Sequence, residues 1–138
     1  MSNLDQFIGG TGVPKTIVNN YSGGGKNNLS DPRQKEILSG SLTATVLKTL
    51  LTISGAGAFN LISAISKDAT PRTVHLKVTL DGVEVFNAIS SAFAAANYGI
   101  DAVVAGYTVS FNTSAVIEVA SSLSETDKVA LAVIYETR

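Results

Sequence analysis

Hydrophobic and polar residues alternate with a period of two over most of the chain after residue 36, the pattern of β-strands with one buried face. The clearest run covers residues 73–80, where every second residue is a valine or leucine. Asp81-Gly82 follows, and the alternation resumes at Val83. An Asp-Gly pair between two such runs predicts a hairpin with a type I′ turn, because that turn needs positive φ at both central positions. This hairpin pairs Leu80 with Val83 and, two residues on, Val78 with Val85.

Shorter apolar runs bounded by Gly, Pro, Asn, Asp and Ser predict the remaining strands. We expect them at residues 41–46, 49–54, 58–66, 102–111, 115–120 and 128–136. Residues 87–99 are alanine-rich and fit either a short helix or an extended crossover. Many short strands at regular spacing predict an all-β fold, an antiparallel β-sandwich of the jelly-roll type.

The first 35 residues differ in composition from the rest of the chain. They hold six of the twelve glycines and two of the three prolines. Such a segment buries too little apolar surface to offset its ordering entropy alone. We therefore divide the chain into an extended, glycine-rich attachment arm at 1–35 and a β-sandwich domain at 36–138. Apolar residues expected to dock the arm in an assembly are Phe7, Ile8, Val13, Ile17, Val18 and Tyr21, and the expected hinge is Gly23, Gly24 and Gly25.

The predicted last strand is apolar on both faces. Its odd positions from 129 to 135 form a core face, and the even positions Ala130, Ala132 and Ile134 are apolar too. A sandwich strand with one solvated face should be polar there. Either the arm or a loop covers this second face, or it is a subunit interface.

Composition favours an assembly component. Apolar residues make up 45% of the 138 residues and charged residues 15%, against about 25% charged in a typical soluble domain. So few charges suggest that other protein covers part of the surface. A net charge of −1 gives no basic patch for nucleic acid. No apolar stretch approaches the roughly 20 residues of a membrane helix, so we expect no membrane insertion.

The sequence contains no recognisable catalytic, cofactor-binding or metal-binding constellation, and we expect none of these functions. Gly25-Lys26 could anchor a phosphate-binding loop, but Asn20 and Asn27 stand where that motif needs glycine and a hydroxyl residue. His75 is the only histidine and is expected on the exposed face of its strand. Tyr98 and Tyr107 lie near the ends of predicted elements and are candidate receptor contacts, for example with a host surface glycan.

Three stretches, "FIGGTGVPKTIVNNYSGG", "LKTLLTISGAGAF" and "RTVHLKVTLDGVEVF", resemble small structural proteins of tailed bacteriophages. The resemblance implies a virion protein whose arm attaches to other virion proteins and whose β-sandwich projects from them as a homo-oligomer, often a homotrimer. The resemblance does not distinguish a tail-fibre subunit from a capsid decoration protein; we expect a non-enzymatic tail-fibre or appendage subunit, assembled in the host cytoplasm. A capsid decoration protein and a carbohydrate- or receptor-binding tip are the alternatives.

Overall fold

The computed structural model describes residues 32–138, and every regular element among them is a β-strand. The arm and hinge residues predicted from the sequence lie outside this range. The strands are β1 Gln34–Leu42, β2 Lys48–Ser54, β3 Gly57–Ser66, β4 Val74–Leu80, β5 Val83–Ile89, β6 Tyr98–Val103, β7 Val109–Phe111, β8 Ser114–Ser121 and β9 Glu125–Thr137.

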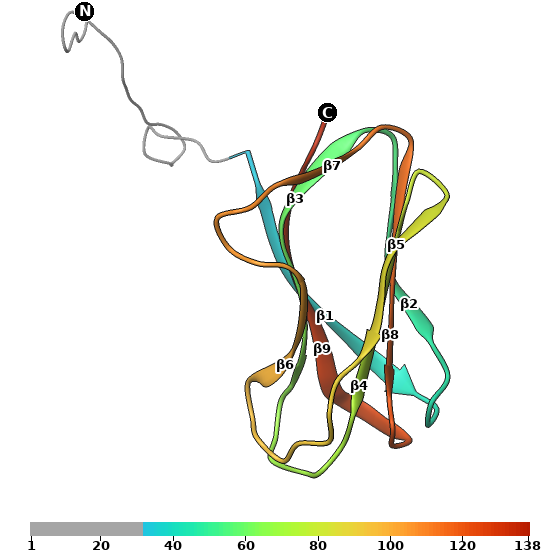
Figure 1. The fold of residues 1–138 in the computed structure, drawn as a ribbon, viewed down its shortest axis with the longest axis vertical. Helices are drawn as coiled ribbons and strands as arrows, with labels where there is room; N and C mark the ends of the chain where they lie inside the picture. The colour runs from blue at the N-terminus through green and yellow to red at the C-terminus, as the bar shows by residue number, and fades with distance from the viewer. Residues whose placement is uncertain (1–31) are drawn as a thin grey trace, which may run out of the picture. The chain divides into compact units, whose positions relative to one another are not determined.

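The strands form two antiparallel sheets that pack face to face (Figure 1). One sheet has the order β1-β9-β3-β6, and the other has the order β2-β8-β4-β5. β7 pairs with the first residues of β3, and β6 pairs with Ile62–Ser66 of the same strand. Because β9 occupies the other side of β3, β6 and β7 act as two halves of one interrupted edge strand.

The connections give the jelly-roll topology predicted from the sequence. The chain alternates between the sheets from β1 to β4, stays in the second sheet for the β4–β5 hairpin, and then returns through β6 and β7 to the first. β8 and β9 then enter the middle of the two sheets, so the last strands to be synthesised become central ones. The all-β sandwich is confirmed.

The β4–β5 hairpin has the predicted turn and a register that shifts by one residue. Asp81 and Gly82 have φ of 54° and 78°, as a type I′ turn requires, and Leu80 pairs with Val83. A β-bulge then places Val78 opposite Phe86 instead of Val85. Phe86 therefore packs against the core, and Val85 is 53% exposed. The predicted pairing of Val78 with Val85 was wrong because alternation alone does not reveal a bulge.

The Asp81 side chain also fastens this turn to the β7–β8 turn. Its Oδ1 accepts backbone hydrogen bonds from Thr113 at 2.6 Å and from Asn112 at 2.9 Å. The backbone N–H of Ser114 donates to the same oxygen at 3.2 Å. These bonds, from Thr113 above all, lower the pKa of Asp81. One carboxylate thus holds two neighbouring turns together.

Two predicted strands are placed differently. The strand predicted at residues 41–46 lies earlier in the chain: β1 occupies Gln34–Leu42, and the chain then turns at Thr45, which has φ of 63°. β1 therefore begins two residues before the predicted domain boundary. Residues 102–111 are not continuous either, since the chain leaves the sheet after β6 and turns at Gly106, with φ of 96°, before β7.

Residues 87–99 contain no helix. β5 continues to Ile89, and an extended segment then crosses to β6. On the way Phe93 forms an isolated bridge with Arg72 and packs its ring edge-on against Tyr98, with centroids 5.0 Å apart. The alanines in this stretch offer too little apolar surface to hold a short helix against the sandwich.

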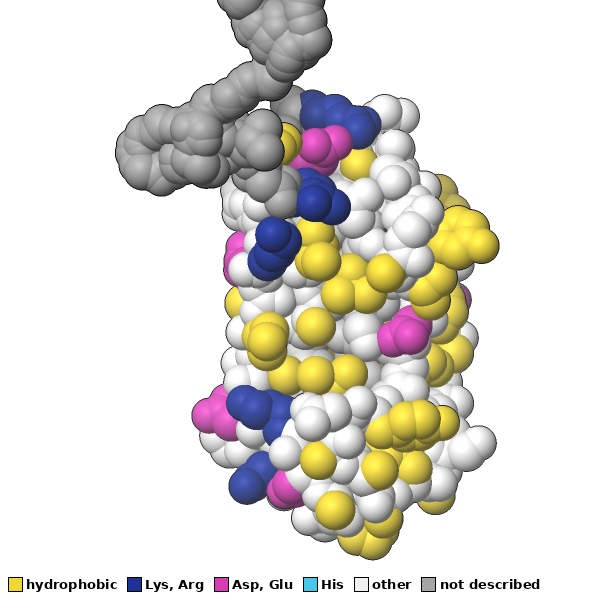
Figure 2. All heavy atoms as spheres, turned by 90° about the vertical axis from the view of Figure 1, so that its left-hand side faces the viewer, with side chains coloured by type: hydrophobic (Ala, Val, Ile, Leu, Met, Phe, Trp, Pro, Cys, Tyr) yellow, Lys and Arg dark blue, Asp and Glu magenta, His cyan; other side chains and the backbone are white. Residues whose placement is uncertain are grey.

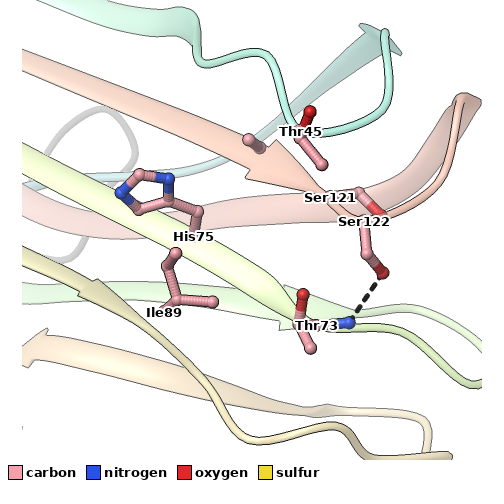
Figure 3. Close-up of a pocket in the computed structure, with 7 residues that line it drawn as sticks. Thr45, Thr73, His75, Ile89, Ser121 and Ser122 are labelled. Carbon is pink, nitrogen blue, oxygen red and sulfur yellow. Dashed lines mark hydrogen bonds between the residues drawn. The ribbon is translucent and has the colours of Figure 1, made fainter.

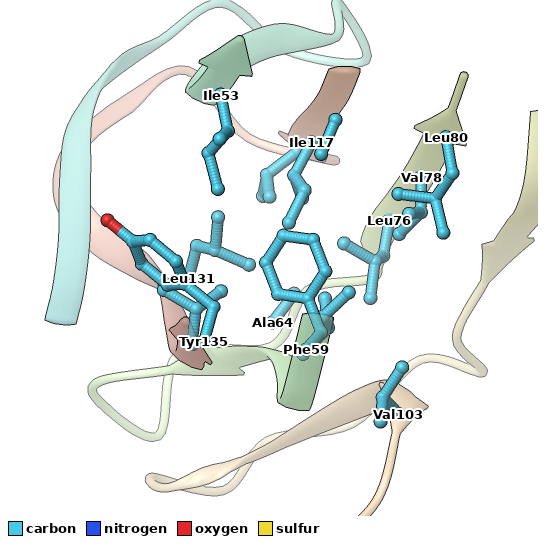
Figure 4. Packing of buried hydrophobic residues seen from close by; sticks show 14 of the residues in the cluster. Ile53, Phe59, Ala64, Leu76, Val78, Leu80, Val103, Ile117, Leu131 and Tyr135 are labelled. Atoms are coloured by element: carbon cyan, nitrogen blue, oxygen red, sulfur yellow. The ribbon is translucent and has the colours of Figure 1, made fainter. Parts of the chain in front are cut away.

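The core lies between the sheets and is built from the inward residues of β3, β4, β8 and β9 (Figure 4). Phe59 is fully buried near its centre, with ring centroids 5.4 Å from Phe111 and 5.8 Å from Tyr135. Leu76, Ile117 and Leu131 are also fully buried. Tyr135 Oη lies 2.6 Å from Glu36 Oε2, to which it donates a hydrogen bond, and this ties β1 to the core strand β9.

A close backbone approach explains one glycine. A Cβ on Gly99 would lie 1.8 Å from the carbonyl oxygen of Ala64 on β3, so Gly99→Ala must separate β6 from β3. We expect it to lower the free energy of unfolding by about 1–3 kcal/mol or more, measured by urea denaturation. Gly40→Ala is the matched control, because its Cβ would meet the flexible end of Lys48 at 3.3 Å and Leu50 Cδ2 at 4.0 Å, with no backbone atom in the way. Equal stability of the two variants would contradict this packing.

Candidate functional site

The outer face of the β1-β9-β3 sheet carries an apolar band across three strands (Figure 2). Strand register creates it: Ala132 lies between Ile37 of β1 and Ser63 of β3, and Ile134 pairs with Leu61. Ala130 pairs with Ile65 in the same way. We define the apolar band as Ile37, Leu61, Ile65, Ala130, Ala132 and Ile134.

Exposure within the band is uneven. Ile37 is 69% exposed, whereas Ala130 is fully buried and therefore adds no free surface itself. Ala132 and Ile134, the other two candidate interface residues, are partly exposed. The sequence interpretation missed Ile37 because that residue fell next to the predicted arm boundary. The sequence did contain a hint. Ile37 and Leu38 are consecutive apolar residues, and in a strand they must point to opposite faces, so one of them is apolar on the outer face.

Charged side chains border the band at both ends (Figure 2). Near one end lie Lys35, which pairs with Ile134 in the strand register, and the Arg138–Glu136 ion pair at 2.9 Å. At the other end Lys128 Nζ lies 3.7 Å from a carboxylate oxygen of Asp68. An apolar centre within a charged border is the usual anatomy of a protein–protein contact surface.

A second apolar surface lies at the edge of the sandwich where β5 faces β6 and β7. A groove of about 120 Å³ opens there between the sheets. We call it the edge groove; it is lined by Ile62, Val78, Leu80, Phe86, Ala102 and Val103. Its surroundings hold five of the large exposed hydrophobic residues of the described chain, namely Val83, Val85, Val104, Tyr107 and Val109.

This edge is also poor in charge. Residues 85–117 contain a single charged residue, Asp101, and Glu84 directly precedes them. Both are acidic. Water solvates such a surface poorly, so contact with another apolar surface would be favourable.

The two candidate receptor tyrosines lie far apart. Tyr98 pairs with Ser66 at one end of β3, and Tyr107 precedes β7, which pairs with Phe59 towards the other end. Seven residues of a strand separate Ser66 from Phe59, which is about 23 Å. Tyr98 and Tyr107 are 57% and 68% exposed, but they do not form one aromatic platform. A glycan contact at either remains a prediction.

His75 lies beside a shallow pocket of about 70 Å³ on the outer face of the other sheet (Figure 3). The His75 Nε2 and Asn87 Oδ1 atoms are 2.6 Å apart. The nearby hydroxyls are used in local structure: Ser122 Oγ accepts the backbone N–H of Thr73, and Ser121 Oγ donates to Glu125. Within residues 32–138 no three metal-ligating side chains gather, and no helix could span a membrane.

A buried ionic cluster lies at the end of the sandwich opposite the Asp81 turn. The Arg72 side chain is fully buried and binds Glu125 through two hydrogen bonds of 2.8 Å. Arg72 Nη1 also lies 2.9 Å from Asp68 and donates to Ser66. The backbone N–H of Thr70, followed by Arg72, lowers the pKa of Asp68 from 3.8 to about 2. Every member has partners, so the cluster acts as a structural clamp between the β3–β4 and β8–β9 connections.

Removing the arginine should destabilise the fold strongly. Arg72→Met would leave Glu125 buried without its cation, and breaking a buried ion pair in this way typically costs about 3–5 kcal/mol. Urea denaturation at neutral pH measures the loss. Replacing Lys77, whose ion pairs of 3.8 and 3.9 Å are partly exposed, is the control and should cost less than about 1 kcal/mol. Similar losses in the two variants would contradict the clamp.

The same cluster predicts an acid limit of stability. The pKa values of Asp68, Asp81 and Glu125 are all lowered in the fold; for Glu125, burial opposes the shift, but the hydrogen bonds from Arg72 and Ser121 outweigh it. Their contribution is therefore complete above about pH 5, beyond the ordinary pKa values of 3.8 for Asp and 4.5 for Glu. It is lost as the pH falls towards 2. The midpoint temperature of thermal unfolding should therefore fall as the pH is lowered towards 2. It should fall less steeply in Asp68→Asn, and an equally steep fall in that variant would contradict a stabilising role for the Asp68 carboxylate.

Comparison with known proteins finds likeness in fold only. No protein-family model and no curated protein matches the sequence. A chain of the T13 viral particle of infectious bursal disease virus (IBDV) matches 76% of this chain at 16% identity, with a TM-score of 0.34. Chains of the Gt and Gx strains match 89% and 88% at 14% and 16% identity, with TM-scores of 0.35 and 0.33.

This chain spans about a third of those viral chains, 31% to 37% of their length. At such identity and TM-score the likeness concerns the β-sandwich alone. It does not single out tailed bacteriophages.

Proposed function

We propose that this protein is a non-enzymatic structural subunit of a virion that assembles with copies of itself through the apolar band. The observation that carries the proposal is the band, because it leaves apolar surface exposed on the outer face of three strands, most of all at Ile37. Ile37, at 69% exposure, contributes nothing to the core. Its burial against a second subunit would remove apolar surface from water.

The fold is compatible with this role. Jelly-roll sandwiches occur in viral capsid proteins, as well as in lectins and cupins. This is an analogy of fold, which by itself assigns no function. The low charge content of the chain also fits a protein whose surface is partly covered by other protein.

The more specific form of the proposal is a tail-fibre or appendage subunit attached to other virion proteins through residues 1–35. Attachment through several identical arms would strengthen binding, because each further arm binds at a high effective concentration. The capsid decoration protein is the alternative within the same class. The two differ in where the protein lies on the particle.

The apolar band makes a direct prediction about oligomeric state. Ile37→Lys in the full chain places a charge in the middle of the proposed contact, so the oligomer should dissociate towards monomer. Size-exclusion chromatography with light scattering measures the change. Val46→Lys is the matched control, since Val46 is 54% exposed but lies outside the band, and its oligomer should persist. A wild-type protein that is monomeric at micromolar concentration would overturn the assembly proposal.

Location on the particle tests the virion role. Antibodies raised against the purified chain should label intact particles in electron microscopy. Labelling at the tail or its appendages supports the specific proposal, and labelling over the head supports the decoration alternative. Particles that carry no label, although the same antibody recognises the purified protein, would argue against a virion component.

A further inference from the structure

The two sheets have four free edges within residues 32–138, and β1 forms the most regular of them. The first sheet ends at β1 on one side and at β6 with β7 on the other, and the second sheet ends at β2 and β5. The edge made by β6 and β7 is interrupted between residues 103 and 109. The pairings of β2 and β5 with their neighbours each contain a register shift near the middle of the strand. Interrupted and bulged edges are protected against pairing with another chain.

The first part of β1 lacks this protection. Its pairing with β9 is regular from Gln34 to Ser39, and the register shifts only between Ser39 and Ser41. Among the described strands β1 pairs with β9 alone, so every second backbone N–H and C=O group of this run points away from the sheet. Lys48 covers the edge only further on, where its Nζ donates to the Ser41 carbonyl oxygen at 3.2 Å. A regular edge of this kind is a template for a further antiparallel strand.

We propose that this edge binds the β1 strand of a second copy of the chain, antiparallel and about a two-fold axis at Ile37. The inference rests on the proposed assembly between copies and names the contact through which it forms. Each copy contributes the same strand, as in isologous two-fold dimers, and the two sheets continue into each other. The unit of assembly is then a dimer, in place of the homotrimer that the sequence resemblance implies.

The outward side chains of β1 select this register. Lys35, Ile37 and Ser39 share the outer face, since they pair with the outward residues of β9. In antiparallel pairing about Ile37, this residue lies opposite Ile37 of the second copy, and Lys35 lies opposite its Ser39. A register displaced by two residues would place Ile37 opposite Lys35 or Ser39 instead. Only the axis at Ile37 brings the two isoleucines together.

Pairing at Ile37 buries the most exposed residue of the apolar band and makes the two bands continuous. Ile37 is 69% exposed in the single chain and lies beside Ala132 of β9. Side chains directly opposite each other in an antiparallel pair have Cβ atoms about 4.5–5.5 Å apart, so the two Ile37 side chains make contact. This contact removes apolar surface from water at the point where the band otherwise ends at a sheet edge.

Charges on either side of the axis are complementary. Ser39 Oγ donates a hydrogen bond to Asp127 Oδ1 at 2.8 Å, so a carboxylate lies beside Ser39. Lys35 of the second copy faces this carboxylate in the proposed register, in addition to the interaction that it makes in its own chain. The ammonium of the neighbouring Lys128 lies instead 3.7 Å from Asp68. The two-fold axis repeats the arrangement, and a lysine against an aspartate on each side favours this alignment of the strands.

Cysteine substitutions can map the contact, because the chain contains no cysteine of its own. In the full chain, Ile37→Cys should form a covalent dimer on treatment with a short bis-methanethiosulfonate crosslinker, detected on non-reducing gels. Val46→Cys is the matched control, since Val46 is 54% exposed but lies outside β1. It should give little covalent dimer at the same protein concentration.

A second pair of variants leaves Ile37 intact and tests the register. Lys35→Cys and Ser39→Cys should each crosslink poorly alone, because four residues of strand, about 13 Å, separate the two copies of either position. Their equimolar mixture should crosslink well, since position 35 of one copy then faces position 39 of the other. A mixture that crosslinks no better than either variant alone would refute the register.

Light scattering of the full chain gives the stoichiometry. Wild-type protein should have the mass of a dimer that does not grow with concentration. Ile37→Lys should be monomeric, because it places two lysines directly opposite each other.

The results separate this inference from the proposed function. An oligomer that Ile37→Lys dissociates, but in which Ile37→Cys crosslinks no better than Val46→Cys, would overturn the β1 pairing and leave assembly through the band in place. A wild-type trimer would do the same. A wild-type protein that is monomeric at micromolar concentration would overturn both.

Discussion

The structure depends on one strand, β9, which is apolar on both faces and hydrogen-bonded on both edges. Its inward residues Val129, Leu131 and Val133 are almost completely buried in the core. Its edges pair with β1 and β3 along most of their length. Because its outward residues are apolar too, the strand that completes the core also supplies the central residues of the apolar band. The same thirteen-residue strand therefore contributes both to the core and to the apolar band.

Polar interactions hold the two ends of the sandwich. At one end the Asp81 carboxylate joins the turns between β4 and β5 and between β7 and β8. At the other end Arg72 joins Asp68 to Glu125. These contacts fix the connections between the sheets. The apolar band and the edge groove lie between these two ends.

Local patterns predicted some elements of the fold well and others poorly. The type I′ turn at Asp81-Gly82 follows from the conformational needs of two residues, and the alternation of β4 follows from one buried face. The start of β1 escaped prediction because its regular structure comes from pairing with β9, about a hundred residues away in the chain. The bulge at Val85 also escaped prediction. Val85 and Phe86 are consecutive apolar residues, so the alternation does not show which of the two faces the core.

The sequence by itself determined the β-sandwich class, the hairpin turn and the apolar character of both faces of the last strand, because these depend on residues close together in the chain. Only the tertiary structure decided that Ile37 joins Ala132 and Ile134 in one band. It also decided that β5 faces β6 and β7 across an open groove, and that Tyr98 and Tyr107 lie apart. Surfaces are made by strand order and register, and those are set by long-range pairing that no local pattern encodes.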